Sequence, residues 1–248
     1  MSDARKPYKA ICFDLDGTLL PMDIDKFLSD YYKGIGVFAG KSGLDAAKFI
    51  EALDSGVKAM MVHEDNKTNH DVFWKAFFEV YPESRERAHD VATEFYETDF
   101  DHIGDDVVPN PFVAKTIELL KEKAYPLVLT TMPMFPKRAV EKRLGWAGVD
   151  PDAFMHMTSY ENSTSIKPKI TYYQENLDLL GLSGQDVLMV GNNTLEDLAF
   201  CKLGADAYLV TDCLLDPIDF DIDSVKHGSF EDFYSWVKGL PDHESAGL

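Results

Sequence analysis

The fold is decided by the stretch YKAICFDLDGT, residues 8–18. Its apolar run, Tyr8 to Phe13, predicts a buried strand, and the Asp and Gly residues that follow are typical of a strand's end. Because alternate side chains share a face of a strand, Asp14 and Asp16 can emerge together where the strand ends. Open α/β sheets bind their ligands at the carboxyl ends of the strands. The stretch therefore predicts a functional site at this edge.

The two carboxylates predict a metal. Close carboxylates repel each other unless a proton or a cation compensates them. Oxygen-rich sites suit Mg²⁺, which keeps several waters and needs only one or two protein carboxylates. An ordinary Asp/Gly turn is the alternative, but acid-x-acid-Gly-Thr directly after a buried strand is a rarer pattern and favours function.

Composition limits the class of protein. The chain has 248 residues, enough for one sizeable core and a second, smaller lobe. Its formal charge is -19 and its 24 Lys and Arg residues form no run, so we expect no nucleic-acid partner. Residues 1–9 lack the apolar region of a signal peptide and no segment is apolar enough to span a bilayer, which predicts a cytoplasmic protein with no membrane partner. Cys12, Cys201 and Cys213 are scattered and predict buried thiols.

Strands and helices alternate along most of the chain. Further apolar runs occur at Pro126–Thr130, Phe154–Met157, Val187–Val190 and Ala207–Val210. Amphipathic stretches occur at Phe112–Lys123, Pro136–Leu144, Ile170–Leu180 and Leu195–Leu203. This alternation predicts an α/β fold with a doubly wound parallel sheet and a Rossmann-like core.

The first strand is followed by a helical insertion. Apolar residues recur at helical spacing in Ile24–Phe38, Leu44–Val62, Asp71–Val80 and Arg85–Phe100. We expect a smaller helical cap domain at residues 20–108, inserted into a catalytic core made of residues 1–19 and 109–248. Prolines restrict the backbone at both junctions, at Pro21 and at Pro109 and Pro111, as expected of a pair of hinges.

Polar motifs follow the predicted strands in a characteristic order. Asp14 and Asp16 come first, then Thr130-Thr131, then Lys167-Pro168, and then the loop at residues 191–197, GNNTLED. With a helical insertion after the first strand, this order resembles the haloacid dehalogenase superfamily, and within it the phosphatases that carry an α-helical cap. The resemblance covers essentially the whole chain.

The resemblance implies a role for each matched residue. Asp14 would attack phosphorus and form an aspartyl-phosphate, which divides one difficult step into two easier ones. Asp16 would protonate the leaving oxygen and later deprotonate the attacking water, while its backbone carbonyl ligates the metal. Thr131, rather than Thr130, would hydrogen-bond a phosphoryl oxygen, and Lys167 would neutralise the charge shared by nucleophile and phosphate.

The implied Mg²⁺ site departs from the family pattern. Its ligands would be Asp14, Asp16, Asn192, Asn193 and Asp197, but the family carries an acid one or two residues after the glycine, where this chain has asparagines. An amide oxygen can bind a hard cation but brings no charge, so we expect modest metal affinity and weakened catalysis. We also expect Asn192→Asp or Asn193→Asp to tighten metal binding.

The expected function is Mg²⁺-dependent hydrolysis of phosphate monoesters, with a small phosphorylated metabolite as substrate. Dehalogenases of this fold lack the second acid of the first motif, so Asp16 argues against that reaction. Two alternatives stay open: a phosphomutase of the same fold, and a degenerate, non-catalytic member that binds a phosphorylated ligand or a protein. The two asparagines favour the degenerate reading, whereas the retained Asp14, Asp16, Thr131 and Lys167 oppose it.

Overall fold

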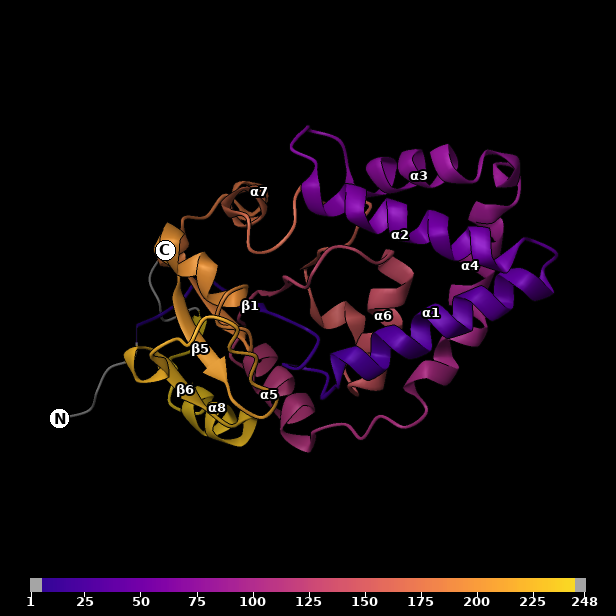
Figure 1. Ribbon diagram of the computed structural model, residues 1–248. Coiled ribbons are helices and arrows are strands. Elements are labelled where there is room, and N and C mark those ends of the chain that lie inside the picture. The colour runs from indigo at the N-terminus through magenta and orange to yellow at the C-terminus, as the bar shows by residue number, and fades with distance from the viewer. Residues whose placement is uncertain (1–5, 244–248) are drawn as a thin grey trace.

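Strand β1 (Ala10–Phe13) lies in the middle of a parallel sheet in the computed structural model, which describes residues 6–243. Within these residues the strand order is β3-β2-β1-β4-β5-β6, and every neighbouring pair is parallel. The other strands are β2 (Leu127–Leu129), β3 (His156–Met157), β4 (Val187–Gly191), β5 (Asp206–Val210) and β6 (Lys226–Gly228). The predicted α/β fold with a parallel sheet is confirmed (Figure 1).

The order of the strands reverses at β1. The chain continues to β2 on one side of β1 and later returns to β4 on the other side. The register places Phe13 beside Leu129 of β2 and Val190 of β4, so the three strands end at the same edge. A crevice forms where the strand order of an open α/β sheet reverses, which positions the residues after β1, β2 and β4 around one site.

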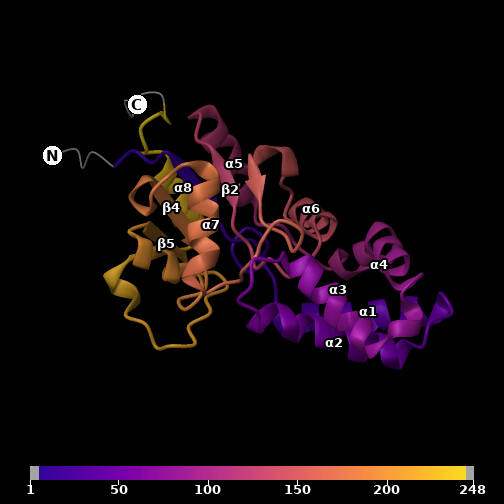
Figure 2. The ribbon, with the colours of Figure 1, turned by 90° about the horizontal axis from the view of Figure 1, so that it is seen from above.

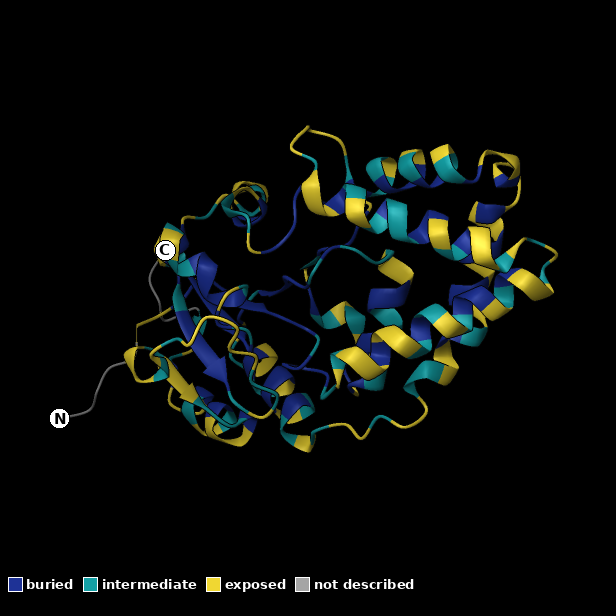
Figure 3. Ribbon diagram, in the orientation of Figure 1, coloured by how far each residue is buried: buried dark blue, intermediate teal, exposed yellow. Residues whose placement is uncertain are grey.

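Both faces of the sheet are covered, which makes the central strands apolar on both sides. Ile11 and Phe13 face the core under α5 (Pro111–Glu122), α6 (Lys137–Trp146) and α8 (Phe230–Val237). Ala10 and Cys12 face the opposite core, under α7 (Ile170–Leu180) and the 3₁₀ segment η5 (Asp197–Leu203). The central strands are accordingly buried throughout (Figure 3).

The insertion after β1 is helical, as its periodicity predicts. It consists of α1 (Ile24–Lys41), α2 (Ala46–Val62), α3 (Asn69–Val80), η1 (Pro82–Ser84), α4 (Ala88–Glu97) and η2 (Asp99–Gly104). We call residues 24–104 the helical insertion, and it lies to one side of the sheet in both views (Figures 1 and 2). Its apolar cluster also takes in Ala139 and Tyr160 from the part of the chain that bears the sheet, whereas Leu20 packs in the core of the sheet.

The first three helices of the insertion begin at side chains that cap them. Asp23 accepts a hydrogen bond from Lys26 N at the start of α1. Asp45 accepts from the amides of the first turn of α2, and Thr68 accepts from Asp71 N in α3. Such caps satisfy amides that have no partner within the helix, which is why these helices start where they do.

Several predicted elements differ from the structure. The single helix predicted over 85–100 is wrong in its bounds, because α4 covers 88–97 and η2 follows it. The stretch at 195–203 is 3₁₀ rather than α, and its regular part begins at Asp197, whose carboxylate accepts hydrogen bonds from the amides of Asn192 and Asn193. The strand predicted at 154–157 is shorter and follows η3 (Pro151–Ala153). The predictions named no element beyond residue 210, where η6 (Ile222–Ser224), β6 and α8 lie.

The remaining short element, η4 (Gly184–Asp186), leads into β4. Within residues 6–243, no helix combines the length and the apolar character needed to cross a membrane.

Candidate active site

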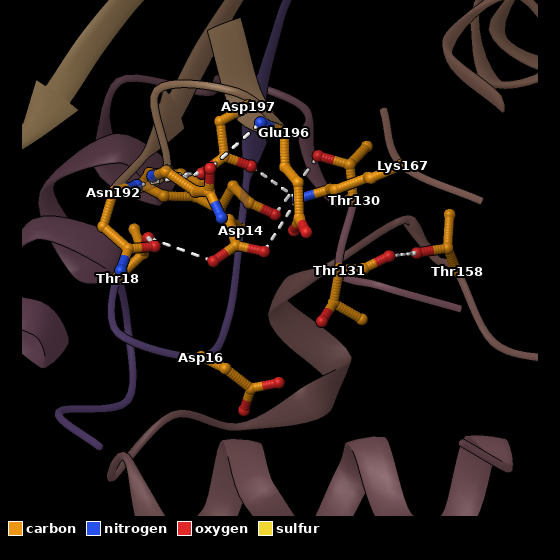
Figure 4. A network of polar contacts seen from close by, with 12 residues as sticks. Asp14, Asp16, Thr18, Thr130, Thr131, Thr158, Lys167, Asn192, Glu196 and Asp197 are labelled. Carbon is orange, nitrogen blue, oxygen red and sulfur yellow. Dashed lines mark hydrogen bonds and ion pairs between the residues drawn. The ribbon is translucent and has the colours of Figure 1, made fainter. Parts of the chain in front are cut away.

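A buried lysine joins two aspartates at the carboxyl edge of the sheet. Lys167 Nζ lies 2.7 Å from Asp14 Oδ1 and 2.6 Å from Asp197 Oδ1, and all three side chains are buried (Figure 4). Burial opposes the charge of Lys167, but the neighbouring carboxylates outweigh it and raise its pKa well above the usual value. The lysine therefore stays cationic and holds two carboxylates that would otherwise repel each other.

Three separate segments supply this group. Asp14 follows β1, Asp197 begins η5 after β4, and Lys167 comes from the loop between β3 and α7. Asp197 Oδ2 accepts hydrogen bonds of 2.9 Å from the backbone amides of Asn192 and Asn193. Burial raises the pKa of Asp197, while Lys167 and these amides favour its ionised form. Gly191 makes this turn possible, because a Cβ there would lie 2.2 Å from Asp197 Oδ2.

A second set of oxygens gathers on the other side of Asp14. Thr18 Oγ1 lies 3.1 Å from both Asp14 Oδ2 and Asn192 Oδ1. Asn192 Nδ2 donates to the carbonyl of Cys213 at 2.6 Å, which turns the amide oxygen toward Asp14. Gly17 has a φ of 82°, and a Cβ there would lie 2.2 Å from Asn192 Nδ2, so glycine is required at this position.

These oxygens suit a hard cation, but the site they form is small. One hydroxyl carries one proton, so Thr18 can donate to only one of Asp14 Oδ2 and Asn192 Oδ1 at a time. The other oxygen is then available to a cation, and oxygen donors fit Mg²⁺. No cluster of three or more His, Cys, Asp or Glu residues in the described chain is placed to hold a metal. The residues fit a weakly bound Mg²⁺ centred on Asp14 and Asn192.

The other two sequence-predicted ligands in this loop are already engaged. Asp197 uses one oxygen for Lys167 and the other for two amides. Asn193 Oδ1 accepts hydrogen bonds of 3.0 Å from the amides of Leu195 and Glu196, which stabilises the turn. The structure brings Asn192 toward Asp14 but turns the oxygen of Asn193 into its own loop.

Asp16 points away from Asp14 and pairs with an arginine (Figure 4). Its Oδ2 lies 2.5 Å from Nη1 of Arg143 on α6, and the two side chains are 17% and 1% exposed. Burial raises the pKa of Asp16, while the charge of Arg143 lowers it. Asp16 Oδ1 and Arg143 Nη2 are both buried without a hydrogen-bond partner in the described chain. The ion pair is thus incompletely satisfied and has capacity for a further polar group.

The two adjacent threonines after β2 differ in their contacts. Thr130 Oγ1 lies 3.3 Å from the carbonyl oxygen of Phe13 and 3.4 Å from Met189 Sδ. Thr131 Oγ1 is buried and has no partner among the described residues, although its carbonyl accepts hydrogen bonds from Thr158 and Tyr172. The backbone of Thr131 is therefore fixed, while its hydroxyl has the capacity for one more hydrogen bond.

A cavity of about 630 Å³ opens above these residues. Its polar lining includes Asp14, Asp16, Asn192, Glu196 and Asp197. Its opposite wall comes from the start of α1, including Leu28, so the helical insertion covers the site. We call this the catalytic cavity. Burial raises the pKa of Glu196 at its edge.

Sequence reasoning gave no role to Thr18, Arg143 or Glu196. Arg143 carried a signal, because it falls on the face of its predicted helix that also holds Val140 and Leu144. A cation on an apolar face predicts a buried acid as its partner. Thr18 and Glu196 carried no comparable signal, since both are ordinary residues of turns.

Comparison with known proteins gives one family and one fold. The family model for haloacid dehalogenase-like hydrolases matches residues 8–203. A HAD phosphatase structure from Thermococcus onnurineus is 18% identical, with 94% of this chain and 99% of that chain covered and a TM-score of 0.57. The L-2-haloacid dehalogenase from Xanthobacter autotrophicus, with chloropropionic acid covalently bound, is 14% identical, with 94% and 99% covered and a TM-score of 0.54.

A Bacillus subtilis protein assigned as a HAD hydrolase and bound to magnesium is 16% identical, with 94% and 100% covered and a TM-score of 0.55. At these identities the likeness shows the fold. The curated proteins include no significant match to this chain.

Proposed function

Because the chain belongs to the haloacid dehalogenase-like hydrolases, we propose that it hydrolyses phosphate monoesters of small metabolites with Mg²⁺ as cofactor. The observation that carries the proposal is the second acid, Asp16, which lines the same cavity as Asp14 and has a buried oxygen without a partner among residues 6–243. An alcohol leaving from phosphorus needs a proton, whereas a halide leaves without one. A carboxyl group at Asp16 has a use in the first reaction and none in the second.

Asp14 acts as the nucleophile in this proposal. Its carboxylate attacks phosphorus, the bond to the leaving oxygen breaks, and an aspartyl-phosphate forms that water then hydrolyses. Lys167, 2.7 Å from Asp14 Oδ1, holds the carboxylate in place and offsets the charge that it shares with the phosphoryl group. The hydroxyl of Thr131, which has no partner of its own among the described residues, donates a hydrogen bond to a phosphoryl oxygen.

Asp16 acts as acid and then as base. Burial raises its pKa, which favours the protonated form needed to deliver a proton to the leaving oxygen. After that transfer its carboxylate can take a proton from the attacking water. Arg143 stabilises the carboxylate between the two steps, because the 2.5 Å ion pair opposes reprotonation from solvent.

Mg²⁺ would be held by Asp14 Oδ2, Asn192 Oδ1 and the backbone carbonyl of Asp16. When bound, the ion would offset the charge of the phosphoryl group. An amide instead of a carboxylate at Asn192 supports a modest affinity, since the charge of the ligand set falls.

A second candidate reaction is displacement of halide from a small acid. It is supported by the neutral amide of Asn192 and by the engagement of Asp16 with Arg143, since neither a metal nor a free acid is needed when the leaving group is already stable. One structure of this fold carries chloropropionic acid covalently bound. The phosphomutase and the non-catalytic reading are the remaining alternatives.

The proposal is tested by hydrolysis of p-nitrophenyl phosphate across a Mg²⁺ titration, with Asp14→Asn as the inactive control. Chloride release from 2-chloropropionate, measured on the same preparation, identifies the second candidate, and isomerisation of a sugar 1-phosphate identifies a mutase. The melting temperature, measured with and without Mg²⁺ and beryllium fluoride, tests for binding of an aspartyl-phosphate mimic independently of turnover. A ligand that binds only the folded state raises the melting temperature. Absence of phosphate release at every Mg²⁺ concentration contradicts the proposal.

A further inference from the structure

A second cavity lies within the helical insertion, beside the catalytic cavity. It has a volume of about 480 Å³, and its walls come from all four α-helices of the insertion, from the loops that follow β2 and β3, and from Arg138 of α6. Protein interiors contain few voids larger than a water molecule, whereas ligand pockets of roughly 300–1,000 Å³ lined by apolar side chains are common. The volume of this cavity is therefore that of a binding pocket. We call it the aromatic cavity.

The lining of the aromatic cavity is mainly apolar and rich in aromatic rings. It includes Tyr31, Phe49, Phe73, Trp74, Tyr96 and Phe135. The polar atoms among these rings satisfy one another, because the hydroxyls of Tyr31 and Tyr96 lie 2.7 Å apart and Trp74 Nε1 lies 3.4 Å from the hydroxyl of Tyr160. A bound group would meet mainly ring faces and methyl groups, although His70, His89 and Thr93 also line the cavity.

The two cavities share part of their walls. Leu28, Met134 and Phe135 line both of them, and Leu28 is 38% exposed. Met134 and Phe135 belong to the same loop between β2 and α6 as Thr131. A molecule with a phosphoryl group near Asp14 therefore has an apolar space next to it, on the far side of three apolar side chains.

The two cavities also differ in the charge of the side chains that line them. The described side chains that line the catalytic cavity include no Lys or Arg, and acids such as Asp23 and Asp25 face it. In the aromatic cavity the cation Arg138 is paired with Glu97 at 2.8 Å. A leaving group that carries its own carboxylate or second phosphate would face the like charge of these acids, and an uncharged apolar group would not.

We propose that the aromatic cavity binds the alkyl or aryl part of the phosphate ester, so that the substrates are phosphate monoesters of apolar alcohols. This inference rests on the proposed function for its link to catalysis, but the binding of an apolar group can be measured without it.

The first experiment compares n-alkyl phosphates from ethyl to octyl at saturating Mg²⁺. We expect kcat/KM to rise about three- to fourfold per added methylene until the cavity is filled, mainly through KM. Equal kcat/KM for ethyl and octyl phosphate overturns the inference and leaves the proposed function intact. Hydrolysis of none of these esters contradicts the proposed function instead, and the inference is then decided by binding.

The second experiment measures binding of N-phenyl-1-naphthylamine, an uncharged apolar fluorophore, to the full chain. We expect saturable binding of one molecule, displaced by 1-octanol. Val57→Phe, which adds bulk to the cavity wall, and Met61→Glu, which places a charge at its 51% exposed rim, should weaken binding about tenfold or more. Both should also lower the octyl-to-ethyl ratio of kcat/KM.

Val37→Phe is the matched control, because Val37 is 51% exposed on α1 and does not line the cavity. It should leave probe binding and the octyl-to-ethyl ratio unchanged. Met61→Glu keeps the test decisive if Val57→Phe fails to fold, since its side chain lies at the surface. No saturable probe binding by the unmodified protein, or equal effects of the cavity variants and Val37→Phe, overturns the inference.

Discussion

Arg143 Nη1 lies 2.5 Å from Asp16 Oδ2, although 127 positions separate the two residues along the chain. The guanidinium also lies over the rings of Phe135 and Phe27, 4.6 Å and 5.7 Å from their centroids. Phe27 belongs to α1, so one side chain of α6 contacts both the candidate acid and the helical insertion. The orientation of Asp16 is thus tied to the packing of the insertion on the sheet.

Arg143→Met should destabilise the protein by about 3–5 kcal/mol at pH 7, because it leaves the carboxylate of Asp16 buried without a counter-charge. The matched control is Arg138→Met on the same helix, whose side chain is 48% exposed and pairs with Glu97. That variant should cost at most about 1 kcal/mol. Urea denaturation followed by circular dichroism gives both values.

The double variant Arg143→Met with Asp16→Asn separates charge from packing. If the ion pair is the cause, removing both partners should recover much of the lost stability. Equal losses in the single and the double variant would mean that packing of the arginine stem dominates.

Thr131→Val should lower kcat/KM for a phosphate ester about 100-fold, since it removes the donor that we propose for a phosphoryl oxygen. Its free energy of unfolding should change by less than about 1 kcal/mol, because the hydroxyl has no partner to lose among the described residues. Thr130→Val is the control and should show the reverse, with a loss of about 1 kcal/mol and little change in turnover, because Thr130 Oγ1 contacts Phe13 and Met189. Identical kinetic losses in both would argue against a phosphoryl contact at Thr131.

Asn192→Asp should tighten Mg²⁺ binding about tenfold or more, because it adds a carboxylate beside Asp14 in place of a neutral amide. Asn193→Asp should have little effect, since its side-chain oxygen accepts hydrogen bonds from its own turn. The sequence alone predicts tighter Mg²⁺ binding for either substitution, whereas the loop geometry predicts it for Asn192→Asp only. Calorimetric titration with Mg²⁺ measures both, and tighter binding by Asn193→Asp alone would refute this ligand assignment.

Asp186 should give a pH-dependent contribution to stability. Hydrogen bonds from Ser183 and the charge of Lys9 lower the pKa of Asp186 to about 2, compared with about 3.9 for an unfolded chain. The stabilisation is present above the unfolded pKa and is lost as the pH falls through about 2. The stability difference between the unmodified protein and Asp186→Asn should therefore shrink between pH 5 and pH 2 in urea titrations. Ser183→Ala should reduce the same pH dependence. A stability difference between the unmodified protein and Asp186→Asn that does not change with pH would contradict this contribution of Asp186.

The α/β fold followed from local patterns, because short apolar runs alternate with amphipathic stretches along most of the chain. The order of the motifs also led us to expect Asp14, Lys167 and Asp197 at one edge of the sheet, since residues after parallel strands meet there. Asp197 was expected there as an Mg²⁺ ligand, and its ion pair with Lys167 came from the structure. Helix periodicity located the insertion, whereas the bounds of α4 and the 3₁₀ form of η5 did not follow from periodicity.

Tertiary structure decided what each polar atom contacts. Asn192 and Asn193 are identical in type and adjacent in sequence, yet one oxygen faces Asp14 and the other caps a turn, because the loop backbone sets their directions. The pairing of Asp16 with Arg143 and the aromatic cavity depend on side chains from segments far apart in the chain. Local sequence specifies hydrophobic periodicity and strand ends, whereas contacts between distant segments exist only after the helices have packed against the sheet.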